Sequence, residues 1–258
     1  MLESQKILNH KTMRISTCLA AYNGSKYIEL QISSILNQLR EQDELIIVED
    51  CSTDDTLKIL ENIQDSRIRL LKNEVNLGVI KSFEKALSNA TKDIIFLSDQ
   101  DDIWLPRKVE KFLDVFEKYP DVTLVISDAQ IIDSNGQLTA ESFFKLRGKF
   151  TANPFSNFVK SKHHGCTLAF RKEMLAFFLP FPADTPMHDI WIGIVNSIYG
   201  KAFYINEPLM QHRRHGKNTG RGIFNNAGIF QIIQWRFSLA KNIVILMLKP
   251  KKYKQLNN

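Results

Sequence analysis

The sequence predicts an α/β protein whose sheet is mainly parallel and flanked by helices. Over the first hundred residues, four short apolar runs alternate with three segments in which apolar residues recur every three or four positions. Strands that alternate with helices of this length form parallel sheets with right-handed crossovers. The first, second and fourth runs end in AYNG, EDCSTDD and DQDD, at the edge where such sheets bind ligands.

Periodicity locates the elements of this first half. The helix after the second strand should have Ser52 or Thr53 as its N-cap, with Asp54 and Asp55 in its first turn. The expected strands cover residues 15–21, 45–48, 68–71 and 93–98, and the expected helices cover 25–39, about 53–63 and 78–90.

The second half is less regular. It contains no internal repeat and no low-complexity segment. We expect a strand over 124–132, a turn at 134–136, loops and short helices over 140–165, a strand over 166–170, a helix over 190–198 and a short strand over 201–205.

Composition is that of an ordinary globular protein with one large core, since 44% of the 258 residues are apolar. The three cysteines are widely spaced and include no CxxC pair. A disulfide framework or zinc knuckle is therefore not expected, and a reducing compartment is favoured. The first 14 residues contain no apolar run of signal-peptide length, so secretion is not expected either.

Positive charge gathers at the carboxyl end of the chain. No acidic residue follows Glu207, whereas ten Lys and Arg residues do, which predicts an anionic partner surface. Residues 228–248 are apolar but contain Arg236 and Lys241, which favours an amphipathic helix over a membrane-spanning one. That helix would lie on the inner membrane face, or pack on the catalytic domain or another subunit. We expect a catalytic domain over 1–222 and a basic helical extension over 223–258.

An acidic cluster follows the fourth strand. Asp99, Asp101 and Asp102 would repel one another at neutral pH. A divalent cation removes that cost, and carboxylates suit Mg²⁺ or Mn²⁺, which also bind diphosphate oxygens. The alternative is that Asp101 or Asp102 caps a helix that starts near Leu105, with Pro106 in its first turn.

Three further sites carry polar side chains. Asp50 ends the second strand and could accept hydrogen bonds from a base or ribose, whereas Cys51 reads as a small buried filler. Asp189, in PMHDIW, is an N-cap or a general base that projects into the cleft. The run HRRHGKN at 212–218 suits a pyrophosphate, and one neutral imidazole there could ligate a metal.

Taken in order, these motifs resemble the family 2 glycosyltransferases, whose nucleotide-sugar-binding fold is of the GT-A type. SDQDDIWLP, MHDIW and the later HG-N look most similar to the rhamnosyltransferase-like branch. The stretches are ISTCLAAYNG (15–24), IIVEDCSTDDT (46–56), NLGVIKSFEKAL (76–87), IFLSDQDDIWLPRKV (95–109), GCTLAFRKEM (165–174), PMHDIWIGI (186–194) and HRRHGKN (212–218).

The resemblance implies roles for individual residues. It places Tyr22 near the nucleotide base, Asp50 on the uracil or thymine edge, and Asp189 as the catalytic base. It makes Asp101 the direct metal ligand and His215 the residue that completes the metal site. The residues that it assigns to the nucleotide sugar are Ala20, Tyr22, Asn23, Asp50, Asn76, Gly78, Asp99 and Arg213.

Three departures from the family pattern concern the donor pocket. Glu49 stands where Asp is common, Cys51 where Gly is common, and HRRHGKN where YRQHGNN is usual. The pocket geometry and the exact sugar are therefore not implied by the resemblance.

The expected function is that of an inverting glycosyltransferase with a Mn²⁺ or Mg²⁺ cofactor. It would transfer rhamnose or another hexose from a nucleotide-diphosphate sugar to a saccharide or lipid-linked acceptor, in the cytoplasm or on the cytoplasmic face of the membrane, during synthesis of bacterial surface polysaccharide. A nucleotidyltransferase of similar fold would favour a Gly-rich, basic loop after the first strand, which AAYNGSKY lacks. A nucleic-acid-binding module would explain the basic tail but not the acidic cluster. A catalytically dead relative that only binds nucleotide sugars would not need Asp101 and Asp189.

Overall fold

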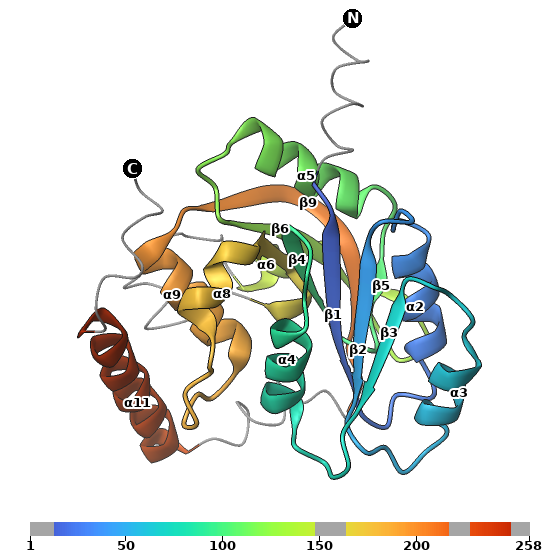
Figure 1. The fold of residues 1–258 in the computed structure, drawn as a ribbon, viewed down its shortest axis with the longest axis horizontal. Helices are drawn as coiled ribbons and strands as arrows, with labels where there is room; N and C mark the ends of the chain where they lie inside the picture. Colours follow the sequence, from blue (N-terminus) through green and yellow to red (C-terminus); the bar gives the residue numbers. More distant parts are fainter. Residues whose placement is uncertain (1–12, 148–163, 217–227, 249–258) are drawn as a thin grey trace, which may run out of the picture.

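A computed structural model describes residues 13–147, 164–216 and 228–248. Within these residues nine strands form one mixed sheet, with helices on both of its sides (Figure 1). The strand order is β3-β2-β1-β4-β8-β6-β9-β5, and β7 pairs with β6 off this path. The expected α/β class is therefore confirmed.

The first half follows the predicted alternation. Its four strands are parallel neighbours, and its helices bury the faces that their periodicity predicted, for example Ile28, Ile32 and Ile35 of the first helix. The elements are β1 (Ile15–Ala21), α2 (Ile28–Leu36), β2 (Glu44–Glu49), α3 (Thr56–Asn62), β3 (Ile68–Lys72), α4 (Val79–Ser88) and β4 (Ile94–Ser98).

The predicted N-cap of α3 is wrong. The helix begins at Thr56, where the carboxylate of Asp54 accepts the backbone N–H at 2.9 Å and also the hydroxyl hydrogen of Thr56. Ser52 and Thr53 bind Asn23 instead: Ser52 Oγ accepts its N–H at 3.0 Å, and the N–H of Thr53 donates to its Oδ1 at 2.8 Å. The loops after β1 and β2 are thereby held together.

The second half differs from the prediction mainly in its last strand. We expected a short strand over 201–205, but β9 is a twelve-residue strand, Ala202–Arg213, parallel to β6 (Leu124–Ile132). Register shifts around Asp128 let Pro208 lie opposite that residue. The strand therefore continues past the Glu-Pro pair and carries the basic run to the acidic cluster.

Neither Asp101 nor Asp102 caps a helix, so that alternative is wrong. A two-residue strand, β5 (Ile103–Trp104), follows them and pairs with β9, and α5 begins only at Lys108. The expected strand at 166–170 begins with a 3-10 helix. The remaining elements are α5 (Lys108–Lys118), β7 (Leu138–Ala140), α6 (Phe143–Arg147), η1 (Gly165–Thr167), β8 (Leu168–Arg171), η2 (Lys172–Met174), α8 (Leu175–Phe178) and α9 (His188–Tyr199).

The carboxyl-terminal helix α11 spans Ile229–Leu248 and lies beside α9 at one end of the molecule (Figure 1). Its buried residues Leu239 and Leu246 belong to the hydrophobic core of the molecule. The predicted domain boundary at residue 222 lies outside the described residues. Within the described part of the chain, no helix is both long enough and apolar enough to cross a bilayer.

Candidate active site at the strand ends

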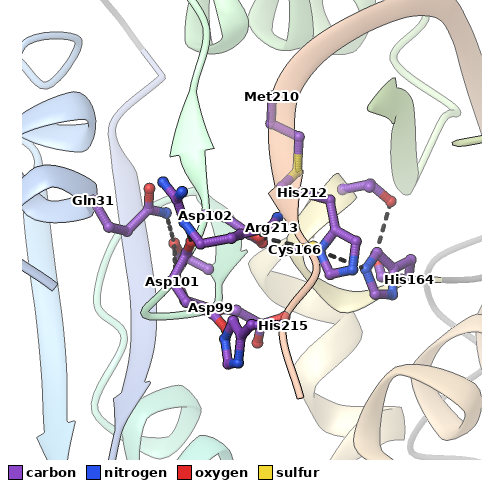
Figure 2. Close-up of polar contacts among 12 residues, drawn as sticks. Gln31, Asp99, Asp101, Asp102, His164, Cys166, Met210, His212, Arg213 and His215 are labelled. Atoms are coloured by element: carbon purple, nitrogen blue, oxygen red, sulfur yellow. Dashed lines mark hydrogen bonds and ion pairs between the residues drawn. The ribbon is translucent and has the colours of Figure 1, made fainter. Parts of the chain in front are cut away.

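The acidic cluster is where the ends of β4 and β9 meet (Figure 2). Asp102 Oδ1 accepts the backbone N–H of Arg213 at 2.9 Å and lies 3.0 Å from His212 Nδ1. Asp101 Oδ2 lies 2.6 Å from His215 Nε2, and the Asp101 carbonyl accepts Arg213 Nε–H at 2.9 Å. The structure thus brings together Asp101 and His215, the two predicted metal ligands.

The three carboxylates have different electrostatic environments. Burial raises the pKa of Asp99, and the neighbouring carboxylates of Asp102, Asp101 and Asp189 raise it further. Burial also opposes ionisation of Asp102, but the charge and hydrogen bond of His212 outweigh it and lower the pKa of Asp102 to about 2. Burial lowers the pKa of His212, yet Asp102 more than compensates and raises it. The contact between Asp102 and His212 therefore favours the charged form of both partners, whereas burial favours the neutral form of Asp99.

The donor atoms here suit a divalent cation. The carboxylates of Asp99 and Asp102 and the thiol of Cys166 offer ligand atoms within 4.8 Å of one another. Asp101 and His215 would hold such a cation. The cation would reduce the repulsion that raises the pKa of Asp99. The residues present fit Mg²⁺ or Mn²⁺, although the metal role of Asp101 and His215 stays a prediction.

Asp189 lies in the first turn of α9 and is 8% exposed. The N-cap is Met187, so the interpretation of Asp189 as a cap is wrong. Its Oδ2 accepts the N–H of Gly165 at 3.2 Å, and its Oδ1 accepts the N–H of Ile190 at 2.8 Å. A Cβ on Gly165 would lie 3.1 Å from His188 Nε2, so a glycine lets η1 approach α9 closely.

Asp50 organises the loop before α4. Its carboxylate accepts hydrogen bonds from Asn73 Nδ2 at 2.7 Å and from the backbone N–H groups of Leu77 and Gly78, each at 2.8 Å. Asn76 Nδ2 donates to the Asp50 carbonyl at 3.2 Å, and Gly78 has a φ of +81°, which favours glycine. The Asp50 carboxylate is thus bound within the protein, and its contact with the base stays a prediction.

Gln100 joins the end of β1 to the acidic cluster, a role the sequence analysis missed. Its side-chain amide accepts from Tyr22 N and donates to Tyr22 O, both at 2.8 Å. A Cβ on Gly24 would lie 2.2 Å from Gln100 Oε1, so this contact requires the glycine. Tyr22 is 44% exposed, Asn23 holds the loop at a φ of +50°, and Ala20 lies partly buried on β1. Donor contacts of these three residues stay predictions.

Tyr27 is a second residue that sequence reasoning missed. Its ring stacks on His215 with centroids 5.4 Å apart, and the Arg213 guanidinium lies 4.6 Å from the same ring. Arg213 is only 3% exposed and also donates to the Asp133 carbonyl at 3.2 Å. These contacts make Arg213 a support for Asp101 and His215, and its predicted contact with the donor stays untested. An aromatic residue in the loop after a strand was the available signal for Tyr27.

His188 is buried, 2% exposed, and stacks on Phe83 at 4.1 Å. Among the described residues, neither of its ring nitrogens has a hydrogen-bond partner. Burial alone lowers the pKa of His188 to about 3. The folded protein therefore holds this imidazole neutral, whereas the unfolded chain protonates it below about pH 6.5.

We expect this difference to make the free energy of unfolding decrease as the pH is lowered below about 6.5. Below about pH 6.5 the unfolded state takes up a proton that folded His188 refuses, which costs up to about 1.4 kcal/mol per pH unit. Between pH 6.5 and 5, wild type should lose about 2 kcal/mol more than His188→Gln, which cannot titrate. Urea unfolding followed by tryptophan fluorescence at each pH measures this. Parallel pH profiles for the two proteins would contradict it.

Comparison with known proteins places the chain among sugar-transferring proteins. The family model described as Glycosyl transferase family 2 matches residues 16–177. The dTDP-rhamnosyl transferase RfbG of Shigella flexneri is 30% identical over 217 residues, 78% of this chain and 72% of that protein. The Escherichia coli protein WfgD, named UDP-Glc:alpha-D-GlcNAc-diphosphoundecaprenol beta-1,3-glucosyltransferase, is 30% identical over 187 residues, covering 70% and 69%.

The fold has solved counterparts. S. aureus TarS 1–349 in complex with UDP-GlcNAc superposes with a TM-score of 0.71 at 18% identity, covering 93% of this chain and 68% of that one. At this identity the likeness shows the fold alone, and it agrees with the predicted GT-A type. The chain spans about two thirds of the length of the curated relatives that it matches. From the family match and these relatives, the chain belongs to the family 2 glycosyltransferases.

Proposed function

We propose that this chain is an inverting glycosyltransferase that moves a sugar from a nucleotide-diphosphate sugar to an acceptor hydroxyl. The observation that carries the proposal is the meeting of Asp99, Asp101 and His215 at the strand ends, within the electrostatic reach of Asp189. Rhamnose or another hexose is the proposed sugar, which the names of RfbG and WfgD support. The nucleotide-sugar complex of TarS supports the proposed class of donor.

In the proposed reaction the acceptor oxygen attacks the anomeric carbon on the face opposite the diphosphate. A new C–O bond forms as the bond to the diphosphate oxygen breaks, which inverts the configuration and releases a nucleoside diphosphate. Asp189 takes the hydroxyl proton as charge develops, which requires hydrogen-bond reach. The N–H groups of Gly165 and Ile190 hold its carboxylate in one orientation for this step.

Asp101 and His215 would hold the Mn²⁺ or Mg²⁺ ion, which when bound supplies positive charge for the leaving diphosphate. Arg213 supports both members of this pair. It donates to the Asp101 carbonyl and lies against the Tyr27 ring, which stacks on His215. Asp99 lies next to the pair (Figure 2), and burial together with the neighbouring carboxylates raises its pKa.

The acceptor that we propose is a saccharide, free or lipid-linked, in the synthesis of bacterial surface polysaccharide. The name of WfgD includes a diphosphoundecaprenol-linked sugar, which supports a lipid-linked acceptor. The proposed location is the cytoplasm or the cytoplasmic face of the membrane. The basic carboxyl-terminal residues support the latter, since anionic lipid headgroups would attract them.

A panel of donors tests the function. Purified protein is incubated with dTDP-rhamnose, UDP-glucose, UDP-galactose and UDP-N-acetyl sugars, with and without Mn²⁺, and release of nucleoside diphosphate is measured. We expect metal-stimulated release from one donor. In Asp101→Ala we expect the stimulated rate to fall by about a hundredfold or more, because several kcal/mol of charge stabilisation is lost.

The matched control is Asp121→Ala, which removes an exposed carboxylate that pairs with Lys201 away from the cluster. It should keep the wild-type rate. Equal metal stimulation in Asp101→Ala and wild type would remove Asp101 from the metal site. Turnover of no donor in the panel would contradict the proposed function.

A further inference from the structure

Helix α11 is apolar on the side that faces away from the protein. Five exposed residues form what we call the outer stripe. They are Phe230, Ile233, Phe237, Val244 and Leu248, which are 81%, 58%, 76%, 55% and 78% exposed. Their spacings of 3, 4, 7 and 4 residues place them on one side of the helix. The buried residues Leu239 and Leu246 lie on the opposite side. An exposed apolar stripe of this length indicates an interaction surface.

The charge of this part of the sequence indicates what covers the outer stripe. Arg236 lies on α11, and Lys249, Lys251, Lys252 and Lys254 follow the helix in the sequence. No acidic residue occurs after Glu207, so the same segment of a second copy of this chain would bring like charge. An anionic lipid surface offers both an apolar layer and the opposite charge.

We propose that α11 docks in the plane of an anionic bilayer, with the outer stripe in the boundary between headgroups and acyl chains. Amphipathic helices of this kind insert about 5–10 Å and bind more tightly as buried apolar area and lipid charge increase. The inner side of α11 stays packed on the catalytic domain, so the whole domain is held against the membrane. The sequence left two alternatives for this helix, packing on protein and contact with a membrane. In this proposal both occur, on opposite sides of the helix.

The docked helix is tied to the segment that leads to Asp189. Asp184 Oδ2 lies 2.9 Å from Lys241 Nζ, its Oδ1 accepts from Asn242 Nδ2 at 2.6 Å, and its carbonyl accepts the Ser238 hydroxyl at 3.1 Å. Asp184 precedes Asp189 by five residues. Docking would therefore hold the segment that leads to Asp189 against the membrane-bound helix. This last step rests on the proposed function, and it favours a lipid-linked acceptor.

Flotation with liposomes tests the proposal on the full chain. Vesicles of phosphatidylcholine alone are compared with vesicles that also contain phosphatidylglycerol. We expect wild type to float with the anionic vesicles only. The triple variant Phe230→Ser, Phe237→Ser, Leu248→Ser should bind the anionic vesicles at least about tenfold more weakly than wild type, because it loses apolar contact area.

The matched control is Leu30→Ser, Leu138→Ser, Leu146→Ser, whose residues are 53%, 47% and 62% exposed on other elements. It should float as wild type does. Donor-dependent release of nucleoside diphosphate, measured without vesicles, should be unchanged in both triple variants. A protein that releases nucleoside diphosphate but does not float would count against docking alone. A protein that floats but releases no nucleoside diphosphate would count against the proposed function alone.

Three results would overturn the docking proposal. The first is wild type that does not float with anionic vesicles. The second is an outer-stripe variant that floats as well as wild type. This outcome counts against the proposal even if a variant with Lys→Gln changes at 249, 251, 252 and 254 no longer floats. The third is a dimer in analytical ultracentrifugation that the outer-stripe variant abolishes while vesicles bind neither protein.

Discussion

Asp189→Asn is expected to lower turnover by about 10²–10⁴-fold while leaving the dissociation constant of the donor within about twofold of wild type. The amide keeps the shape of the side chain and can still accept the N–H of Gly165, which lies 3.2 Å from Oδ2. It cannot take the acceptor proton. Because the proposed role of Asp189 is to take the proton of the acceptor hydroxyl, the loss should fall on kcat rather than on donor binding.

Initial rates at saturating donor and titration calorimetry with the unreactive nucleoside diphosphate measure the two quantities. Asp121→Asn is the control, since Asp121 is an exposed residue that pairs with Lys201 on the surface. Circular dichroism checks that α9 stays folded in the Asp189 variant. Near-normal turnover in a folded Asp189→Asn protein would assign the base to another residue.

Asp102→Ala is expected to cost about 3–5 kcal/mol in the free energy of unfolding. The substitution leaves the imidazolium of His212 buried without its counter-charge and removes the acceptor of the Arg213 N–H. The raised pKa of His212 means that this ring is charged at pH 6, so the loss should be largest on the acid side of neutrality. Unlike Asp101, Asp102 thus acts as an internal anchor between β4 and β9.

Urea unfolding at pH 6 measures the loss in the free energy of unfolding. Asp121→Ala is the control, because it breaks an exposed pair where Asp102→Ala breaks a buried one. Asp121 and Lys201 lie 2.7 Å apart, yet their side chains are 64% and 61% exposed. Solvent screening should make the cost of breaking that pair much smaller than the cost at Asp102. Similar losses in the two variants would mean that Asp102 and His212 are not an ion pair in solution.

Much of the first half could be predicted because its signals are local. The apolar run of β1 and the three-to-four-residue spacing in α2 specify strand and helix over a few neighbouring residues. The start of α3 could not be predicted this way. Ser52 and Thr53 are both competent caps, but they bind Asn23, and the helix begins only at Thr56 with Asp55 at the N-cap position.

The strand β9 was predicted too short for a similar reason. Glu207 and Pro208 interrupt its apolar pattern and indicate a break. Pairing with β6, which shifts register around Asp128, carries the strand past them. Such pairing depends on a segment far away along the chain, so no pattern within the strand itself reveals it.

The sequence by itself determined the α/β class, the family and the edge of the sheet where the acids gather, because periodicity and motif order are properties of neighbouring residues. Only the tertiary structure decided that His215 contacts Asp101 while His212 contacts Asp102, since these partners lie more than a hundred residues apart. It also decided which side of α11 is buried. Apolar residues occur on more than one side of that helix, and only its packing separates Leu239 and Leu246 from the exposed outer stripe.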